Sequence, residues 1–211
     1  MSEMKDRVKE VKRAFIIEVA KDLFFEKGYE NTSIDEIAKS AEMSKSTLYT
    51  YIKSKEELFM HIHLQGMRRR FDILNEKMNI KSTGAEKIYT IGKEYYHYFK
   101  ENMGYFRLYM YEDYNSLDRK KVGEELYSEF TNLLDRLIVI WKGALELGIQ
   151  DQSIRSDIDI GYLDKYLAYT LRAILNVAFS PEKVIHIKDT FDEEQFYFQY
   201  LDLFMTAIKK S

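Results

Sequence analysis

Residues 32–58 carry three helix-start signals in close succession, and these signals narrow the possible folds more than any other part of the chain. Ser33 is followed three residues later by Glu36, and Ser54 by Glu57, which is the S-x-x-E spacing of a capping box. Ser44 precedes a third helical run that ends near residue 51. The stretch therefore predicts two short helices followed by a longer one.

The first two of these helices are joined by a very short connection. Only Glu42 and Met43 separate Ala41 from Ser44, which is the connection that a helix-turn-helix needs. Apolar residues recur so that both helices and the turn share one buried side, namely Ile34, Ile37, Ala38, Ala41, Met43, Leu48 and Ile52. The outer face of the second helix offers donors, acceptors and aromatic rings but no carboxylate, through Lys45, Ser46, Thr47, Tyr49, Thr50 and Tyr51. Such a face suits the major groove of DNA.

The charge pattern restricts any DNA contact to a local surface. The formal net charge of −3 argues against a protein that coats nucleic acid indiscriminately. Residues 43–55 nevertheless contain three lysines and no acidic residue. We expect contacts with base edges from Lys45, Ser46, Thr47, Tyr49 and Thr50, and contacts with phosphates from Thr32, Ser33, Tyr51, Lys53 and Lys55. Ser44, at the start of the second helix, completes the predicted DNA-binding set.

Residues 13–58 also resemble the N-terminal DNA-binding region of the TetR family of bacterial transcriptional regulators. The resemblance lies in Ala20, Phe24, Gly28-Tyr29, Thr32-Ser33, Ile37-Ala38, Ser44, Thr47-Leu48-Tyr49 and Ser54-Lys55-Glu56-Glu57-Leu58. Two positions depart from the family pattern, which usually has Gly in place of Glu42 and Phe in place of Ile52. A left-handed Glu42 would cost about 1 to 2 kcal/mol that Gly would not. The resemblance implies a dimeric repressor that a small molecule releases from its operator.

The rest of the chain is predicted to be helical, so the fold class is all-α. A single proline, few glycines and long 3.6-residue periodicities favour about nine helices. Besides those around the turn, we expect helices at residues 5–27, 54–78, 84–101, 103–114, 119–148, 157–179 and 192–210, the last one starting at Asp192 with Gln195. The predicted domains are residues 1–53, which bind DNA, and residues 54–211, which bind the effector and dimerise.

The last two predicted helices carry more apolar surface than one face can bury. Examples are Leu163, Leu167, Leu171, Phe196, Leu201 and Phe204, so a second buried surface or a thick monomeric core is required. By resemblance, residues 157–179 and 192–210 form a homodimer interface. A two-fold dimer also places two recognition helices about 34 to 36 Å apart, one turn of DNA.

Aromatic residues are concentrated in the middle of the chain, with ten between Tyr89 and Tyr114. They suit either a core or a pocket for a small organic effector, and the resemblance points to the pocket. Arg172 lies in an apolar run and shares a helix face with Tyr169 and Asn176, so the three residues could bind a polar effector group, form an ion pair or face solvent. Consecutive Arg68, Arg69 and Arg70 point in different directions, which favours a solvated or snorkelling role. The predicted effector-binding set is Met67, Phe71, Tyr95, Phe99, Tyr109, Met110, Trp141, Tyr169, Arg172 and Asn176.

The sequence also bears on two other classes of protein. Glu94 and His97 form one E-x-x-H pair, but a di-iron bundle enzyme needs a second, and none precedes His61, His63 or His186. An enzyme is therefore not expected, and neither is a metal or cofactor. A helical protein-interaction module without DNA binding stays open. The absence of cysteine, of a secretory signal and of a membrane span fits a cytoplasmic protein.

Overall fold

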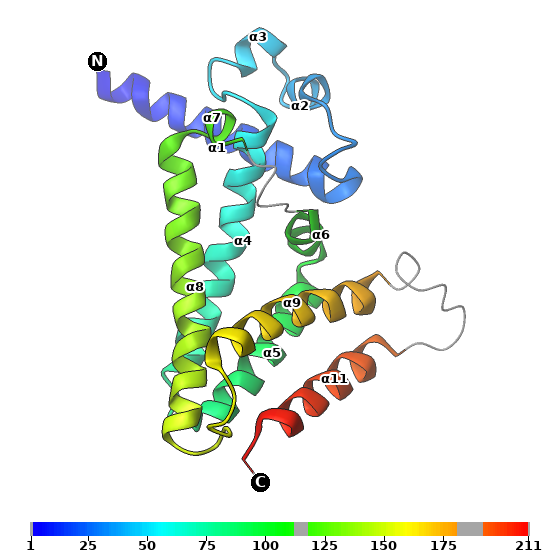
Figure 1. The fold of residues 1–211 in the computed structure, drawn as a ribbon. Helices are drawn as coiled ribbons and strands as arrows, with labels where there is room; N and C mark the ends of the chain where they lie inside the picture. The colour runs from blue at the N-terminus through cyan, green and yellow to red at the C-terminus, as the bar shows by residue number, and fades with distance from the viewer. Residues whose placement is uncertain (1, 112–117, 181–191, 211) are drawn as a thin grey trace. The chain divides into compact units, whose positions relative to one another are not determined.

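The computed structural model describes residues 2–111, 118–180 and 192–210 (Figure 1). Within these ranges the regular elements are ten α-helices, and the only strand-like feature is an isolated antiparallel bridge between Ile154 and Lys209. The predicted all-α fold class is confirmed. In chain order the helices are α1 (Ser2–Lys27), α2 (Ile34–Ser40), α3 (Lys45–Leu48), α4 (Lys55–Met78), α5 (Gly84–Glu101), α6 (Met103–Tyr111), α7 (Arg119–Val122), α8 (Glu124–Gln150), α9 (Ile160–Phe179) and α11 (Glu193–Ile208).

A break at Gly123 explains why the described helices outnumber the nine that were expected. The predicted helix at residues 119–148 is divided there into α7 and α8, because Gly123 has a φ of +96° that a helix cannot accommodate. The predicted helix at residues 103–114 ends as α6 at Tyr111, and Tyr114 lies outside the described residues. The helix predicted to begin after Ser44 is also shorter than expected, since α3 comprises only four residues.

The chain divides into two compact units. Unit 1 comprises residues 1–68 and 102–133, and unit 2 comprises residues 69–101 and 134–211. Unit 1 therefore holds the predicted helix-turn-helix together with α6, α7 and the first parts of α4 and α8. Unit 2 holds α5, α9, α11 and the remainder of α4 and α8.

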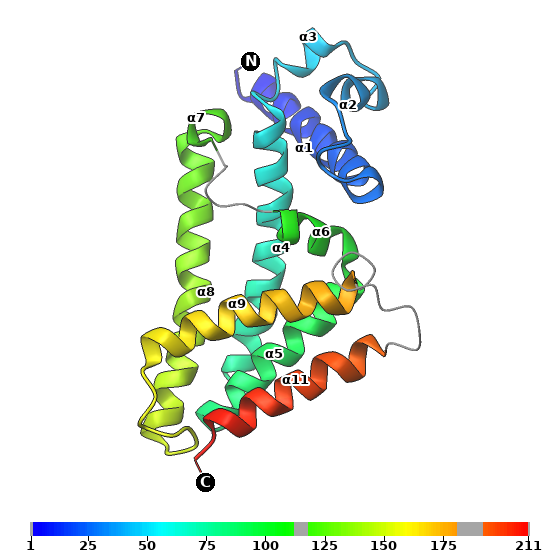
Figure 2. The same cartoon turned by 45° about the vertical axis from the view of Figure 1, so that its right-hand side comes forward.

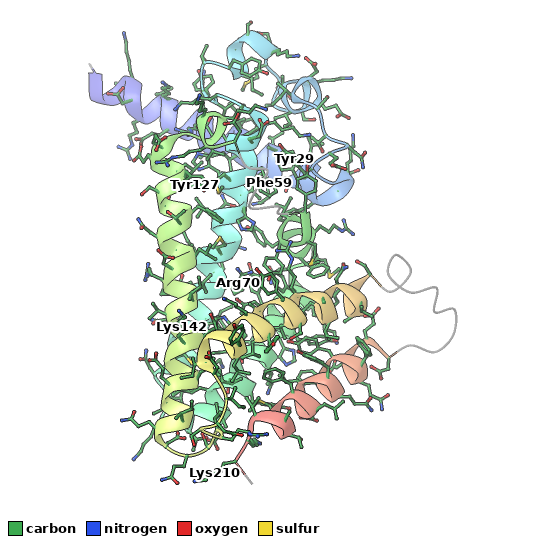
Figure 3. The ribbon with its side chains drawn as sticks, viewed as in Figure 1. Tyr29, Phe59, Arg70, Tyr127, Lys142 and Lys210 are labelled. Carbon is green, nitrogen blue, oxygen red and sulfur yellow. The ribbon has the colours of Figure 1, made fainter. Side chains whose placement is uncertain are left out.

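The core of unit 1 forms around the C-terminal half of α1. Its buried face consists of Ile16, Ile17, Ala20 and Phe24, which recur at helical spacing. Helix α6 packs on this half of α1, with the rings of Phe25 and Tyr105 in edge contact at 4.9 Å. Figure 3 shows Tyr29, which follows α1, beside Phe59 of α4, and their ring centroids are 5.0 Å apart. Through these contacts α1, α4 and α6 pack together in the unit that also holds the helix-turn-helix.

Unit 2 is built around α5, α9 and α11, which lie side by side in both views (Figures 1 and 2). Leu163, Leu167, Leu171 and Leu175 form the buried face of α9. The buried hydroxyl of Tyr197 on α11 donates a hydrogen bond of 2.7 Å to the carbonyl of Gly92 on α5. Asp192 caps α11 by accepting from the Gln195 N–H at 2.8 Å, as the sequence predicts.

Candidate nucleic-acid interface

The connection between α2 and α3 is a Schellman turn centred on Glu42. The Met43 N–H bonds to the Ala38 carbonyl at 2.9 Å, and the Glu42 N–H bonds to the Lys39 carbonyl at 3.1 Å. This pattern requires a left-handed residue after the C-cap, and Glu42 has a φ of +54°. Glu42 thus adopts the conformation for which glycine is preferred, and the turn forms despite the strain of about 1 to 2 kcal/mol.

The start of α2 is fixed by the predicted capping box. The Ser33 hydroxyl accepts from the Glu36 N–H at 3.2 Å, while the Glu36 carboxylate accepts from the Ser33 N–H at 2.9 Å. Lys27 forms an ion pair with the same carboxylate at 3.0 Å. Hydrogen bonding from Ser33, followed by the Lys27 contact, lowers the pKa of Glu36 to about 2. The carboxylate is therefore charged, and it accepts the Ser33 N–H just before α2 begins.

Helix α3 buries one residue and exposes the rest. Leu48 is fully buried, whereas Lys45, Ser46 and Thr47 are exposed. The Ser44 hydroxyl caps the helix by accepting from the Thr47 N–H at 3.1 Å, and it lies 2.8 Å from the hydroxyls of both Ser46 and Thr47. A cluster of hydroxyl groups thus occupies the exposed N-terminal end of α3, where donors and acceptors can meet base edges.

The residues after α3 form a further turn. The Thr50 N–H bonds to the Thr47 carbonyl at 3.0 Å, and the Thr50 hydroxyl bonds to the same carbonyl at 2.7 Å. Tyr49 is 47% exposed, so its ring lies on the outer side with the hydroxyl groups. Tyr51 is half-buried, and the ammonium of Lys12 lies 5.8 Å from the centre of its ring.

Glu57 holds the start of α4 in a way that differs from the predicted capping box. The Ser54 hydroxyl does accept from the Glu57 N–H, at 2.9 Å. The Glu57 side chain does not return to Ser54, however, but accepts from the Lys53 N–H and forms an ion pair with Arg13 of α1. Only 4% of this side chain is exposed, so the carboxylate connects α1, the loop after α3 and α4 from the interior.

His61 extends this connection by one side chain. Its Nε2 atom lies 2.8 Å from a terminal nitrogen of Arg13. Because a guanidinium only donates, this ring nitrogen accepts and carries no proton. Burial, followed by the nearby Arg13 charge, lowers the pKa of His61, which agrees with a neutral ring.

The three lysines of the predicted interface have different surroundings. Lys45 pairs with Asp35 of α2 at 2.9 Å, and this contact raises the pKa of the lysine. The ammonium of Lys55 lies 4.1 Å from the centre of the Tyr29 ring, and burial lowers its pKa. Lys53 is exposed, while its backbone N–H is held by Glu57. Lys53 thus combines a fixed backbone with an accessible charge.

The structure places Thr32 differently from the rest of the predicted phosphate set. Its side chain is buried, and its hydroxyl donates to the Gly28 carbonyl at 2.9 Å, at the C-terminal end of α1. The hydroxyl proton is therefore used within the protein. The buried Thr32 side chain is therefore left out of the proposed phosphate contacts. Ser33 is exposed, and its hydroxyl donates to the Glu36 carboxylate at 3.1 Å.

In unit 2, part of the predicted effector set comes together as a cluster of aromatic rings. The centroid of Tyr95 lies 5.4 Å from that of Trp141 and 6.0 Å from that of Phe99. The guanidinium of Arg70, labelled in Figure 3, lies 5.0 Å from the Tyr95 centroid and 5.4 Å from the Phe99 centroid. Only 5% of Arg70 is exposed, so the expected solvated or snorkelling role is wrong for this residue. We define Arg70, Tyr95, Phe99 and Trp141 as the aromatic cluster.

The remaining members of the predicted effector set lie elsewhere. Phe71 is buried, with the guanidinium of Arg136 4.0 Å from its ring centroid. Tyr169 is 75% exposed, whereas Arg172 and Asn176 are half-buried, so the trio lies toward the outer side of α9. Met67, Tyr109 and Met110 belong to unit 1.

Some residues of these sites carry no clear signal in the sequence. The sequence indicates Glu57 only as a capping residue, although its partner Arg13 is 44 positions away. Asp35 and Lys45 are ten positions apart on different helices. Helical spacing relates only residues three or four positions apart, so it cannot predict such pairs. Arg70 could have been distinguished only by its spacing from Met67 and Leu74, which are both buried.

The residues of the E-x-x-H motif have structural contacts. Glu94 lies 3.8 Å from the ammonium of Lys77, and the His97 ring packs near Tyr96 and Phe198. No group of three His, Cys, Asp or Glu residues in the described ranges is arranged to hold a metal ion. Among the described helices, none has the length and apolar character needed to cross a membrane.

A capped two-helix turn with a hydroxyl-rich exposed helix defines a helix-turn-helix DNA-binding protein. Residues 16–62 match the family model of bacterial regulatory proteins of the tetR family. The chain is 26% identical over 145 residues to a fatty acid metabolism regulator protein of Bacillus subtilis, covering 69% of this chain and 72% of that protein. It is 26% identical over 160 residues to the transcriptional repressor KstR2 of Rhodococcus jostii, covering 75% and 76%.

Solved structures show the same fold over nearly the whole chain. The regulator FadR from Bacillus subtilis, in complex with stearoyl-CoA, has a TM-score of 0.68 at 20% identity, covering 92% of this chain and 97% of that one. The ketosteroid regulator KstR2 of Mycobacterium tuberculosis has a TM-score of 0.69 at 18% identity, covering 94% and 95%. Residues 16–62 thus form a DNA-binding region of the TetR family, and the chain is a DNA-binding transcriptional regulator.

The left-handed backbone at Glu42 leads to a prediction about stability. Replacing Glu42 by Gly should raise the free energy of unfolding by about 1 kcal/mol, because glycine adopts a positive φ without steric cost. Chemical denaturation monitored by circular dichroism measures the change. Glu42→Ala is the matched control, since it removes the carboxylate but keeps the Cβ atom, and it should give no such gain. Equal stabilisation by both variants would contradict the strain.

Proposed function

We propose that α3 and the residues around it read the operator, with α3 lying in the major groove. The exposed hydroxyl cluster at the start of α3, held on a capped turn, is the observation that carries this proposal. Lys45, Ser46, Thr47, Tyr49 and Thr50 would meet base edges, and Ser44 positions the hydroxyls of Ser46 and Thr47. Ser33, Tyr51, Lys53 and Lys55 would contact phosphates, assisted by the N-terminal ends of α2 and α4.

Lys53 and Thr47 should respond differently to substitution. Lys53→Ala should weaken binding to every DNA sequence and reduce the slope of log affinity against log salt by about 0.9, the value for one phosphate contact. Thr47→Ala should instead change which bases are preferred, at about 1 to 3 kcal/mol for the affected base pair. Binding is measured by fluorescence anisotropy on operator fragments selected from a random-sequence pool.

Lys142→Ala provides the control for Lys53→Ala. Lys142 is an exposed lysine on α8 (Figure 3), outside the proposed interface, so its removal should leave the salt slope unchanged. If the slope of log affinity against log salt is unchanged in Lys53→Ala, Lys53 does not contact a phosphate. Absence of sequence-selective binding by the unaltered protein would favour the alternative of an interaction module without DNA binding.

We also propose that α9 and α11 form a homodimer interface. Their exposed sides hold large apolar or aromatic residues, with Tyr162 at 62%, Tyr166 at 60%, Tyr169 at 75% and Leu203 at 71% exposure. Burying these side chains against a second copy would remove apolar area from water. A two-fold dimer would supply the second α3 that a symmetric operator requires.

Charged substitutions on α9 and α11 test the dimer. Tyr169→Asp or Leu203→Asp should convert the protein to a monomer in sedimentation equilibrium, because each would place a carboxylate in an apolar interface. Ile80→Asp is the control, since Ile80 is 59% exposed but lies just after α4. A dimer that survives both interface substitutions, with unchanged association, would exclude this surface.

For the effector, we propose a long-chain acyl thioester of coenzyme A that binds at the aromatic cluster. Supporting observations are the buried rings of Tyr95, Phe99 and Trp141 beside the Arg70 guanidinium, and the similarity to a fatty acid metabolism regulator. Aromatic rings suit an apolar chain, while a nearby cation favours an anionic group. Because the rings are in mutual contact, entry of an acyl chain would have to separate them.

Trp141 is the only tryptophan of the chain, so its fluorescence reports on this cluster. Stearoyl-CoA should change the Trp141 emission and release the operator, whereas free coenzyme A should do neither. Phe99→Ala should weaken the response by about tenfold or more through lost apolar contact, while Phe15→Ala, which changes an exposed ring on α1, should not. An equal effect of free coenzyme A would contradict an acyl-chain site.

The proposed switch uses the helices that continue from one unit into the other. Helix α4 carries Lys55 at its start and Phe71 and Leu74 near its end, so a shift at the effector site would move the DNA-binding end. The functional division at residues 53 and 54 is kept as part of this proposal, whereas the compact units divide α4 after residue 68. A repressor of this kind acts on chromosomal DNA, from which we infer a cytoplasmic location.

A further inference from the structure

The N-terminal half of α1 carries an apolar stripe that the proposed DNA-binding, dimer and effector surfaces leave unused. Met4 is 70% exposed, Val8 52%, Val11 65% and Phe15 51%. These residues are four, three and four positions apart, which is the alternating spacing of a helix-packing seam. We call these four residues the α1 seam.

The α1 seam faces away from the core of unit 1. At about 100° per residue, the four side chains fall within about 60° of one another around the helix. The core residues Ile16, Ile17, Ala20 and Phe24 lie on the opposite side. In Figure 1 the end of α1 marked N extends beyond the neighbouring helices of unit 1. The seam is thus both accessible and separate from the core of unit 1.

Charges on both edges of the seam are positive. Lys5 and Lys12 lie along one edge, and Arg7 lies along the other, all exposed. Glu18 would continue the seam by one step, but it pairs with Lys21 instead, so the seam ends at Phe15. Over three helical turns, a narrow apolar line is therefore bordered by cations.

This arrangement distinguishes between possible occupants. A second copy of α1, parallel or antiparallel, would bring lysine and arginine edges together, which is unfavourable. A bilayer surface is bound by helices with a broad apolar face, wider than the roughly 60° of this seam. A helix with its own narrow apolar seam and acidic edges matches both the width and the charge.

We propose that the α1 seam docks an acidic amphipathic helix of another protein. The apolar side chains of the partner would pack on Val8, Val11 and Phe15, and its carboxylates would pair with Lys5, Arg7 and Lys12. Helix α1 is already ordered, so this side of the contact pays no further cost of helix formation. A regulator with such a surface would respond to a protein as well as to a small molecule.

The test uses two synthetic helical peptides of three heptads. Both carry Ile and Leu at the seam positions, one with Glu and the other with Lys at the flanking positions. The full-length protein should bind the acidic peptide about tenfold or more tightly than the basic one in fluorescence anisotropy, with an affinity that falls as salt rises. Val11→Asp should abolish binding, and Val139→Asp, at an equally exposed valine on α8, should not.

Other outcomes overturn the proposal. Equal binding of the two peptides, or binding that persists in Val11→Asp, would exclude the seam as the docking surface. Sedimentation with phosphatidylserine vesicles that Val11→Asp abolishes would assign the seam to lipid, and self-association lost in Val11→Asp would assign it to a second copy. Circular dichroism confirms the fold of each variant, and unchanged operator binding by Val11→Asp separates this surface from α3.

Discussion

The buried carboxylate of Glu57 is the interaction on which the geometry of the DNA-binding end depends. It accepts from the Lys53 N–H in the loop after α3, pairs with Arg13 of α1 and sits on the first turn of α4. A carboxylate with so little exposure is stable only when its oxygens are satisfied, so its partners must keep their places. The position of α3 therefore follows from one charge as well as from the apolar contacts of Leu48 and Ile52.

The features that were predicted correctly from the sequence are local ones. The capping box of Ser33 and Glu36, the cap at Ser44 and the short turn at Glu42 involve neighbours within a few residues, where backbone geometry leaves little choice. Helical periodicity likewise placed α1, α4, α5 and α11 closely. Local signals were incomplete at Gly123, where one glycine inside a predicted helix gave no indication of a positive φ.

Features that depend on distant contacts could not be derived in this way. The sequence predicts Thr32 as a phosphate ligand, but its hydroxyl donates to the Gly28 carbonyl at the end of α1. Arg70 reads as a solvated arginine, but the fold places it against Tyr95 and Phe99, which come from a different helix. In both cases the side chain has its usual chemistry. Its partner is set by packing, which helical spacing does not encode.

The ion pair between Lys45 and Asp35 means that the recognition surface is partly neutralised before it meets DNA. A base acceptor that binds Lys45 has to replace the Asp35 carboxylate, so this contact exchanges one partner of the ammonium for another. The free energy gained by this contact is the difference between the two pairings of Lys45. Fewer salt ions are also released from the DNA and the protein on binding. Lys45, the cation of α3, would then add little to the overall attraction of the protein to DNA. Its contacts would serve mainly to discriminate among operators.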